Sequence, residues 1–151
     1  MRSVEVTADL SGVIGEEAFP RLADFQQYQR FSDVVLDLQV APESDTSSIS
    51  NWTVKLGPGT ASWSQRDTID RAAKTIRFER LAGDIDVFSG RWAVRDIAGG
   101  CSVTFSVEFD TGLFLLAGVV EPMIANLLRE NIAAIISGLF GTAASVHAQS
   151  S

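Results

Sequence analysis

Ser62-Trp63-Ser64-Gln65-Arg66 is the stretch from which the fold can be worked out, because polar and aromatic residues alternate in it. Side chains of a strand point to opposite faces with a period of two, so this alternation predicts a strand. One face would carry Ser62, Ser64, Arg66 and Thr68, and the other Ala61, Trp63, Gln65 and Ile69. An inward Arg66 would bind or act on a ligand, whereas an outward one is a surface charge, and composition alone favours the outward orientation.

The same alternation recurs on both sides of this stretch. Apolar residues occupy every second position in residues 4–10, 34–40, 52–56, 85–97 and 103–109, and another strand is expected around Ile76 and Phe78. Short turns rich in Gly separate most of them, which predicts a meander of antiparallel strands with one apolar face. Gly90 shares a face with Phe88 and Trp92, and a glycine in such a place marks close approach of another backbone or of a ligand.

Helical spacing appears at two places in the chain. Residues 16–25 and 24–31 predict two short helices after the first strand, and residues 113–140 predict a long helix that Pro122 should kink. The apolar run at residues 113–116 could be a lid, a dimer contact or core, with core as the default. A sheet with one apolar face needs a covering layer, so we expect an α+β fold in which the long helix lies across the sheet.

The composition narrows the chemistry. The 151 residues predict one domain over residues 1–141, followed by a disordered tail over residues 142–151, which contains the only histidine, His147. With one histidine in the tail and one cysteine, Cys101, we expect no metal site, no disulfide, no histidine-based catalysis and no cofactor. Any chemistry must come from Arg, Asp, Glu, Tyr28 or hydroxyl groups.

Charge and hydropathy limit the partners and the location. A net charge of −7 argues against nucleic acid as the main partner. The chain starts without a signal-like apolar segment, and its longest uncharged apolar run, residues 112–120, is too short to be a transmembrane segment. We therefore expect a cytoplasmic protein. The sequence leaves the oligomeric state open, with a homodimer as the default because dimers are common.

The order of these elements, together with particular residues, resembles the START-like helix-grip superfamily, in its polyketide cyclase/dehydrase and coenzyme Q-binding branch. The matching motifs are Ala23-Asp24-Phe25-x-x-Tyr28, Trp63-Ser64-Gln65-Arg66, Phe88-x-Gly90-x-Trp92, Gly99-Gly100-x-x-Val103-x-Phe105-x-Val107-x-Phe109 and Leu128-Arg129-Glu130-Asn131. Each motif is weak alone, but their order and spacing over residues 4–139 are fairly specific for the fold.

The resemblance implies a curved antiparallel sheet of about seven strands wrapped around the long helix, with a deep apolar cavity between them. In aromatase/cyclases of this family, an arginine on the middle strand and a nearby serine polarise substrate oxygens during aldol cyclisation and dehydration. Arg66 and Ser64 stand at the matching positions, which turns the expectation for Arg66 from outward to inward. The implied substrate-binding residues are Tyr28, Trp52, Trp63, Phe88, Trp92, Phe105, Met123, Leu127 and Asn131.

Two functions remain open at this point. The first is a polyketide cyclase that needs no cofactor and takes its substrate from an acyl carrier protein, a partner that the acidic surface does not favour. The second is a non-catalytic protein that binds a quinone, polyketide or lipid. The general base is not identified, and Asp37, Asp86 and Glu108 are candidates by residue type only.

Overall fold

The computed structural model describes residues 1–56, 59–112 and 117–150 of the chain. The turn expected at residues 57–58 and the apolar run at residues 113–116 lie outside these residues. In chain order the elements are β1 (Arg2–Ser11), α1 (Gly15–Ala23), η1 (Phe25–Phe31), β2 (Val35–Pro42), β3 (Ser47–Leu56), β4 (Gly59–Asp70), β5 (Thr75–Gly83), β6 (Val87–Ile97), β7 (Gly100–Asp110), α2 (Ala117–Phe140), η3 (Gly141–Ala143) and β8 (Ala144–Ser150).

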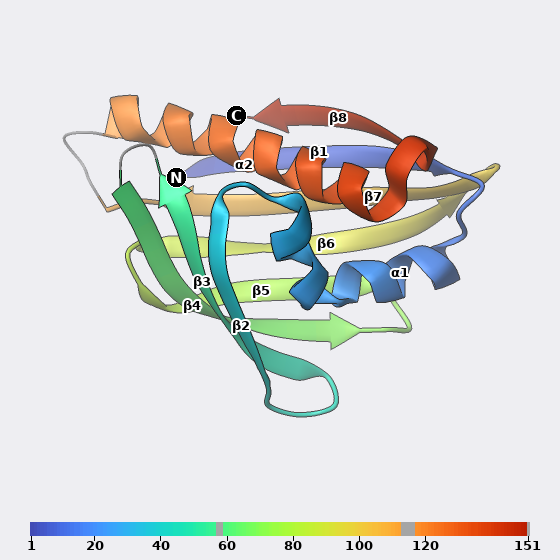
Figure 1. Cartoon of the computed structure of the whole chain (residues 1–151), viewed down its shortest axis with the longest axis horizontal. Coiled ribbons are helices and arrows are strands. Elements are labelled where there is room, and N and C mark those ends of the chain that lie inside the picture. The colour runs from blue at the N-terminus through green and yellow to red at the C-terminus, as the bar shows by residue number, and fades with distance from the viewer. Residues whose placement is uncertain (57–58, 113–116, 151) are drawn as a thin grey trace.

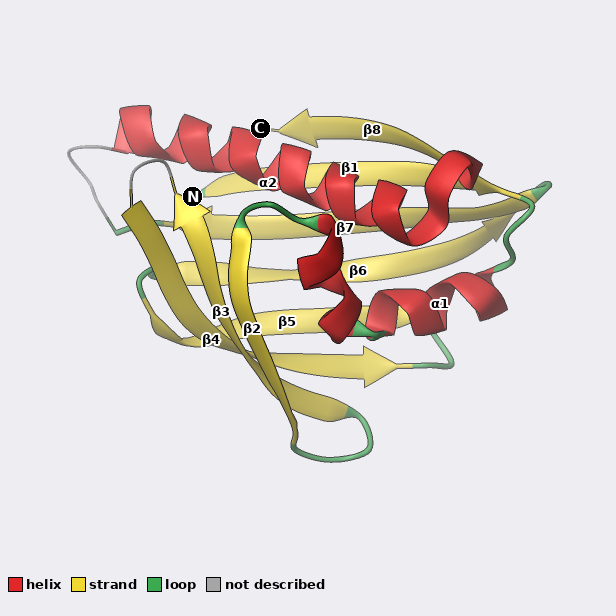
Figure 2. Cartoon of the chain, in the orientation of Figure 1, coloured by secondary structure: helices red, strands yellow, loops and turns green. Residues whose placement is uncertain are grey.

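The described strands form one antiparallel sheet of eight strands in the order β2-β3-β4-β5-β6-β7-β1-β8. Strands β2 and β3 cross the front of the molecule at a steep angle to β5, β6, β7 and β1, so the sheet curls around the space beside α2 (Figure 1). Helices α1, η1 and α2 all lie on the same face of this sheet (Figure 2). The predicted α+β helix-grip fold is confirmed.

The eighth strand corrects the prediction of a disordered tail. β8 pairs with β1 in antiparallel register, with Ala144 opposite Leu10 and Val146 opposite Ala8. The unpaired edge of β1 supplies backbone partners, and both Ala144 and Val146 pack against the core. His147 lies opposite Thr7 and is exposed, so the only histidine stays outside the interior.

Strand β2 carries a second correction. The alternation of residues 34–40 predicts that Leu36 and Leu38 share the inward face. A register irregularity between Val35 and Asp37 shifts the phase, so that Val35 is buried and Leu36 is exposed. A bulge of this kind inserts one residue into the period of two. The order of apolar residues in the sequence does not indicate where it occurs.

Helix α2 packs against β1, β8 and η1 and leaves the β3–β6 part of the sheet to enclose a cavity. By length and composition, Val119–Ala143 would also suffice to cross a membrane. Such composition is weak evidence, since the helix that covers the sheet of a folded domain passes the same test. Pro122 lies inside α2, where the sequence predicts a kink.

The contact between α2 and η1 depends on Gly138. A Cβ atom added there would lie 2.2–2.5 Å from the Cβ, Cγ and Cδ1 atoms of Phe31. Helix propensity alone predicts that Gly138→Ala stabilises the protein by about 1 kcal/mol. We expect the opposite, a loss of about 1–3 kcal/mol, because the Phe31 ring must be displaced.

Urea unfolding of the Gly138→Ala variant measures the sign of this change. The double variant Phe31→Ala/Gly138→Ala is the control, because removal of the ring should restore the benefit of alanine in a helix. A gain in stability in the single variant would show that Phe31 moves at no cost.

Candidate functional site

A cavity lies between the inner face of β3–β6, helix α2 and η1. Its volume is about 70 Å³, and apolar side chains make up most of its wall. The lining residues are Phe25, Tyr28, Val34, Trp52, Val54, Trp63, Gln65, Asp67, Ile76, Phe78, Phe88, Trp92, Phe105, Leu127, Leu128, Asn131, Ile132 and Ile135. Room of this size holds a few water molecules, whereas sites for drug-sized ligands measure about 300–1,000 Å³. A larger ligand therefore requires side chains to move.

Aromatic rings cover the sheet side of the cavity. The indoles of Trp52 and Trp63 are stacked, with centroids 6.1 Å apart and an angle of 5° between their planes. Tyr28 meets Trp92 edge to face at 6.0 Å, and Trp92 meets Phe105 at 4.9 Å. These planar walls fit a flat ligand, because offset and edge-on ring contacts are the favourable ones between aromatic groups.

Gly90 allows the ring of Phe78 and the backbone of β7 to approach β6 closely, because it has no side chain. Its Cβ position would lie 1.9 Å from the backbone oxygen of Ser106, 2.8 Å from the Cα of Val107 and 2.9 Å from the Cζ of Phe78. The close approach expected at this glycine is therefore made by the neighbouring backbone and by the ring of Phe78, which packs over it from β5.

A continuous chain of hydrogen bonds joins five buried or half-buried side chains of β3 and β4. Trp63 Nε1 donates to Gln65 Oε1 at 2.8 Å, and Gln65 Nε2 donates to Asp67 Oδ1 at 2.7 Å. From the other side, Trp52 Nε1 donates to Ser50 Oγ at 2.8 Å, and Ser50 Oγ donates to Asp67 Oδ2 at 2.5 Å. The two stacked indoles are thus the ends of a network that has a carboxylate at its centre.

Asp67 is the only carboxylate in the described wall of the cavity. Only 2% of its surface is exposed. Burial raises the pKa of Asp67 from 3.8 to about 6, and the hydrogen bonds from Ser50 and Gln65 partly oppose this shift. A carboxyl group with a pKa near neutrality can both accept and return a proton at physiological pH, as a general acid–base group must.

Tyr28 is the other ionisable group of the wall. Its hydroxyl donates to the backbone oxygen of Leu22 at 2.5 Å, and only 2% of the residue is exposed. Burial, followed by the nearby charges of Asp67 and Asp24, raises the pKa of the Tyr28 hydroxyl well above its usual value. The phenol therefore stays neutral and is held by the backbone of α1.

Most of the predicted binding residues lie in this wall. Strands and η1 contribute Tyr28, Trp52, Trp63, Phe88, Trp92 and Phe105, and α2 contributes Leu127 and Asn131. Met123 is the exception, because it is 42% exposed and does not line the cavity. The helical pattern around Met123 is apolar on more than one face, so spacing alone could not tell the side that faces the sheet.

The inward placement of Arg66 is wrong, and that of Ser64 with it. Both lie on the outer face of β4, where Arg66 is exposed and Ser64 is half-exposed. Arg66 Nε donates to Glu43 Oε1 at 2.9 Å, and Arg66 Nη2 donates to Glu43 Oε2 at 3.1 Å. This pairing raises the pKa of Arg66 and lowers that of Glu43. The physical reason is the period of two along the strand. Because Trp63 faces the core, Gln65 and Asp67 face it too, and Ser64 and Arg66 face outward.

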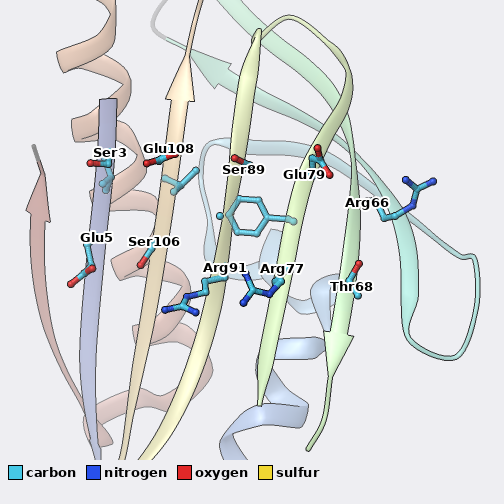
Figure 3. A pocket seen from close by; sticks show the side chains of 14 residues that line it. Ser3, Glu5, Arg66, Thr68, Arg77, Glu79, Ser89, Arg91, Ser106 and Glu108 are labelled. Atoms are coloured by element: carbon cyan, nitrogen blue, oxygen red, sulfur yellow. The ribbon is translucent and has the colours of Figure 1, made fainter. Parts of the chain in front are cut away.

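Arg66 stands at the rim of a second, larger hollow on the outer face of the sheet (Figure 3). Its volume is about 860 Å³, and it is open to solvent. The labelled side chains around it mix arginines with glutamates and hydroxyl groups. Arg77 lies directly opposite Arg91 across β5 and β6. An open hollow with mixed charges does not exclude water, so the enclosed inner cavity is the better candidate site.

The other acidic candidates also lie outside the cavity. Asp37, Asp86 and Glu108 are exposed. Among the described residues, no group of three or more His, Cys, Asp and Glu side chains is placed to hold a metal ion.

Sequence reasoning missed three residues of the candidate site, namely Ser50, Gln65 and Asp67. The signal for Asp67 was present, since residues 63, 65 and 67 share one face of β4. Polar side chains on an otherwise apolar strand face must bond to one another when they are buried, so a glutamine and a carboxylate on that face indicate a buried polar network.

A family model described as polyketide cyclase/dehydrase and lipid transport matches residues 16–136. The chain belongs to this polyketide cyclase/dehydrase family. A comparison with curated proteins found no match.

Solved structures similar to this member of the polyketide cyclase/dehydrase family share its fold at low sequence identity. A Thermus thermophilus protein has a TM-score of 0.79 at 19% identity, with 89% of this chain and 93% of that chain covered. The ZhuI aromatase/cyclase of a Streptomyces species has a TM-score of 0.76 at 16% identity, with 93% of each chain covered. A Mycobacterium smegmatis START superfamily protein has a TM-score of 0.70 at 13% identity, with 93% and 97% covered. These likenesses establish the START-like fold.

Proposed function

We propose that this protein binds a hydrophobic polyketide-like ketone in the inner cavity and promotes its aldol cyclisation and dehydration, with Asp67 as the acid–base group. The observation that carries the proposal is the lone buried carboxylate in the described wall of an aromatic cavity. Membership of the polyketide cyclase/dehydrase family and the likeness to the ZhuI aromatase/cyclase support it.

The chemistry follows from the pKa of Asp67, which is about 6. As a carboxylate, Asp67 removes a proton from a methylene group that two flanking carbonyls make acidic, and an enolate forms. The enolate carbon attacks a second carbonyl carbon of the same molecule, so a carbon–carbon bond forms and the carbonyl oxygen becomes an alkoxide. Asp67 returns its proton to that alkoxide. The regenerated carboxylate of Asp67 then removes the remaining proton from the same carbon, and a double bond forms as the bond between the neighbouring carbon and its hydroxyl group breaks. Asp67 gives this proton to the departing hydroxide, so water leaves and the carboxylate is restored without any co-reactant.

The ligand must widen the cavity to enter. Val34 lines it from the segment before β2, and Leu127 and Leu128 line it from α2. These are the groups that entry of a ligand would displace. The stacked indoles of Trp52 and Trp63 would then lie against the flat part of the ligand. An acyl carrier protein is the partner that would deliver a poly-β-ketone to the cavity.

We expect Asp67→Asn to abolish cyclisation while leaving binding of a flat ligand in place. The variant removes the group that moves the proton, and rate losses of about 10²–10⁴-fold are typical when an acid–base residue is removed. Product profiling with a poly-β-ketone thioester measures the chemistry. Quenching of tryptophan fluorescence by 1,4-naphthoquinone measures binding, since tryptophans line the cavity.

Arg66→Ala is the matched control, because Arg66 is the preceding residue of the same strand and points to the opposite face. It should keep both the products and the binding of wild type. Unchanged products in the Asp67→Asn variant would refute the acid–base role of Asp67. If wild-type protein binds the quinone but leaves the spontaneous product mixture unchanged, the protein is a non-catalytic binder and the cyclase proposal fails.

A further inference from the structure

Ser32, between η1 and β2, has no free lone pair. Its Oγ accepts hydrogen bonds from the backbone nitrogens of Val34 at 3.3 Å and Val35 at 3.2 Å. A hydroxyl oxygen has two lone pairs and one proton. With both lone pairs engaged, Ser32 can only donate its proton to the next partner. That partner is Asn131 of α2.

This bond determines which way the Asn131 amide points. Since Ser32 must donate, the atom it meets is the amide oxygen, Oδ1, and the amide nitrogen, Nδ2, lies on the other side of the group. Asn131 is half-buried and lines the cavity. Within the described part of the chain, Nδ2 donates no hydrogen bond to the protein, so its protons are open to a ligand or to water.

Most hydrogen-bond donors of the other polar side chains in the wall are already bonded to the protein itself. Both indole N–H groups, one proton of the Gln65 amide and the Tyr28 hydroxyl are hydrogen-bonded to neighbours. At the centre of the network, Asp67 offers oxygen atoms, which attract donors and repel carbonyl oxygens. The cavity thus has an acceptor on β4 and a free donor on α2.

We infer that Asn131 Nδ2 donates a hydrogen bond to a carbonyl oxygen of the cavity ligand, with Ser32 as the residue that holds the amide in this orientation. The inference rests on the proposed function and adds the residue that recognises the ketone: because of Asn131, a ketone is preferred to a hydrocarbon of the same shape. When Asp67 removes a neighbouring proton, that oxygen gains negative charge. The Asn131 bond then strengthens and stabilises the enolate.

The test uses 1-tetralone and tetralin, which share a shape and differ in the carbonyl group. Binding to wild-type protein, Asn131→Leu and Ser32→Ala is measured by tryptophan fluorescence, and the carbonyl stretch of bound tetralone by infrared difference spectroscopy. Leucine has the same branched arrangement of non-hydrogen atoms as asparagine and has no donor. A neutral hydrogen bond contributes about 0.5–1.5 kcal/mol, so Asn131→Leu should weaken tetralone about 2- to 12-fold.

The same variant should leave tetralin unchanged and shift the carbonyl stretch to the frequency of an unbonded ketone. Ser32→Ala should weaken the binding of tetralone less than Asn131→Leu does, because the amide of Asn131 can still rotate into place in that variant. Equal weakening of both ligands, or an unshifted carbonyl stretch, would overturn the inference while binding in the cavity stands. If neither ligand binds to folded wild-type protein, the proposed cavity function fails, and the inference fails with it.

Discussion

The Asp67→Asn variant is expected to be more stable than wild-type protein at pH 8, although it loses activity. Burial of Asp67 raises its pKa from 3.8 to about 6, which means that the folded state disfavours the charged form. The cost above pH 6 is about 3 kcal/mol at most, since one pKa unit corresponds to about 1.4 kcal/mol. Asparagine carries no charge and avoids this cost, so we expect a gain of about 1–3 kcal/mol.

The pH dependence gives this prediction its sign. Because the pKa is higher in the folded state, the folded protein binds a proton more tightly than the unfolded chain. The stabilisation by protonated Asp67 is complete below about pH 4 and is lost as the pH rises to about 6. The advantage of Asp67→Asn should therefore be full at pH 8 and vanish near pH 4.

Urea unfolding at pH 4, 6 and 8 measures this effect. Asp37→Asn is the control, because Asp37 is an exposed aspartate on β2. The free energy of unfolding of Asp37→Asn should differ little from that of wild-type protein at every pH. A variant of Asp67 that is less stable than wild type at pH 8 would show that the hydrogen bonds from Ser50 and Gln65 outweigh the burial of the charge.

Gly90→Ala is expected to destabilise the protein more than Gly138→Ala does. The added Cβ would overlap the backbone oxygen of Ser106 at 1.9 Å and approach the Cα of Val107 at 2.8 Å. Both are backbone atoms of β7, held by pairing on each side of that strand, so they cannot move as a side chain can. Overpacking commonly costs about 1–3 kcal/mol, and we expect at least the upper end for Gly90→Ala.

Gly59→Ala is the matched control for this substitution. Gly59 also lies in a strand, and the nearest atom to its Cβ position is 4.0 Å away. Urea unfolding should show little change for Gly59→Ala and a large loss for Gly90→Ala. Similar midpoints for the two variants would mean that β6 and β7 can separate locally without cost.

The fold could be predicted from the sequence because its pattern is redundant. Several alternating stretches and one long helical stretch each indicate the same two-layer arrangement, so a local error does not change it. The bulge after Val35 and the tail that forms β8 were missed for the opposite reason. Each depends on backbone pairing with a neighbour, which leaves little trace in the order of apolar residues.

The site was harder to predict because it depends on single residues. Arg66 and Asp67 are adjacent and point to opposite faces of β4. The family resemblance favoured the arginine, whereas the period of two that begins at Trp63 places the aspartate inside. In this strand, the alternation that starts at Trp63 predicts which side chains face inward better than the position of Arg66 in the family motif does. Asn131 lies in the wall of the cavity, but the direction of its amide nitrogen follows only from the partners of Ser32.

The position of β1 has a consequence for folding kinetics. This strand precedes all the others in the chain, yet its partners are β7 and β8. Val6, for example, pairs with Phe105 and Ala148. Pairing across such sequence separations closes very long loops, and folding rates fall as the mean separation of contacts grows. The alternating apolar side chains of β1 therefore stay uncovered while residues 12–99 are synthesised. We expect slow refolding and a need for low protein concentration during it, since an unpaired apolar strand favours aggregation.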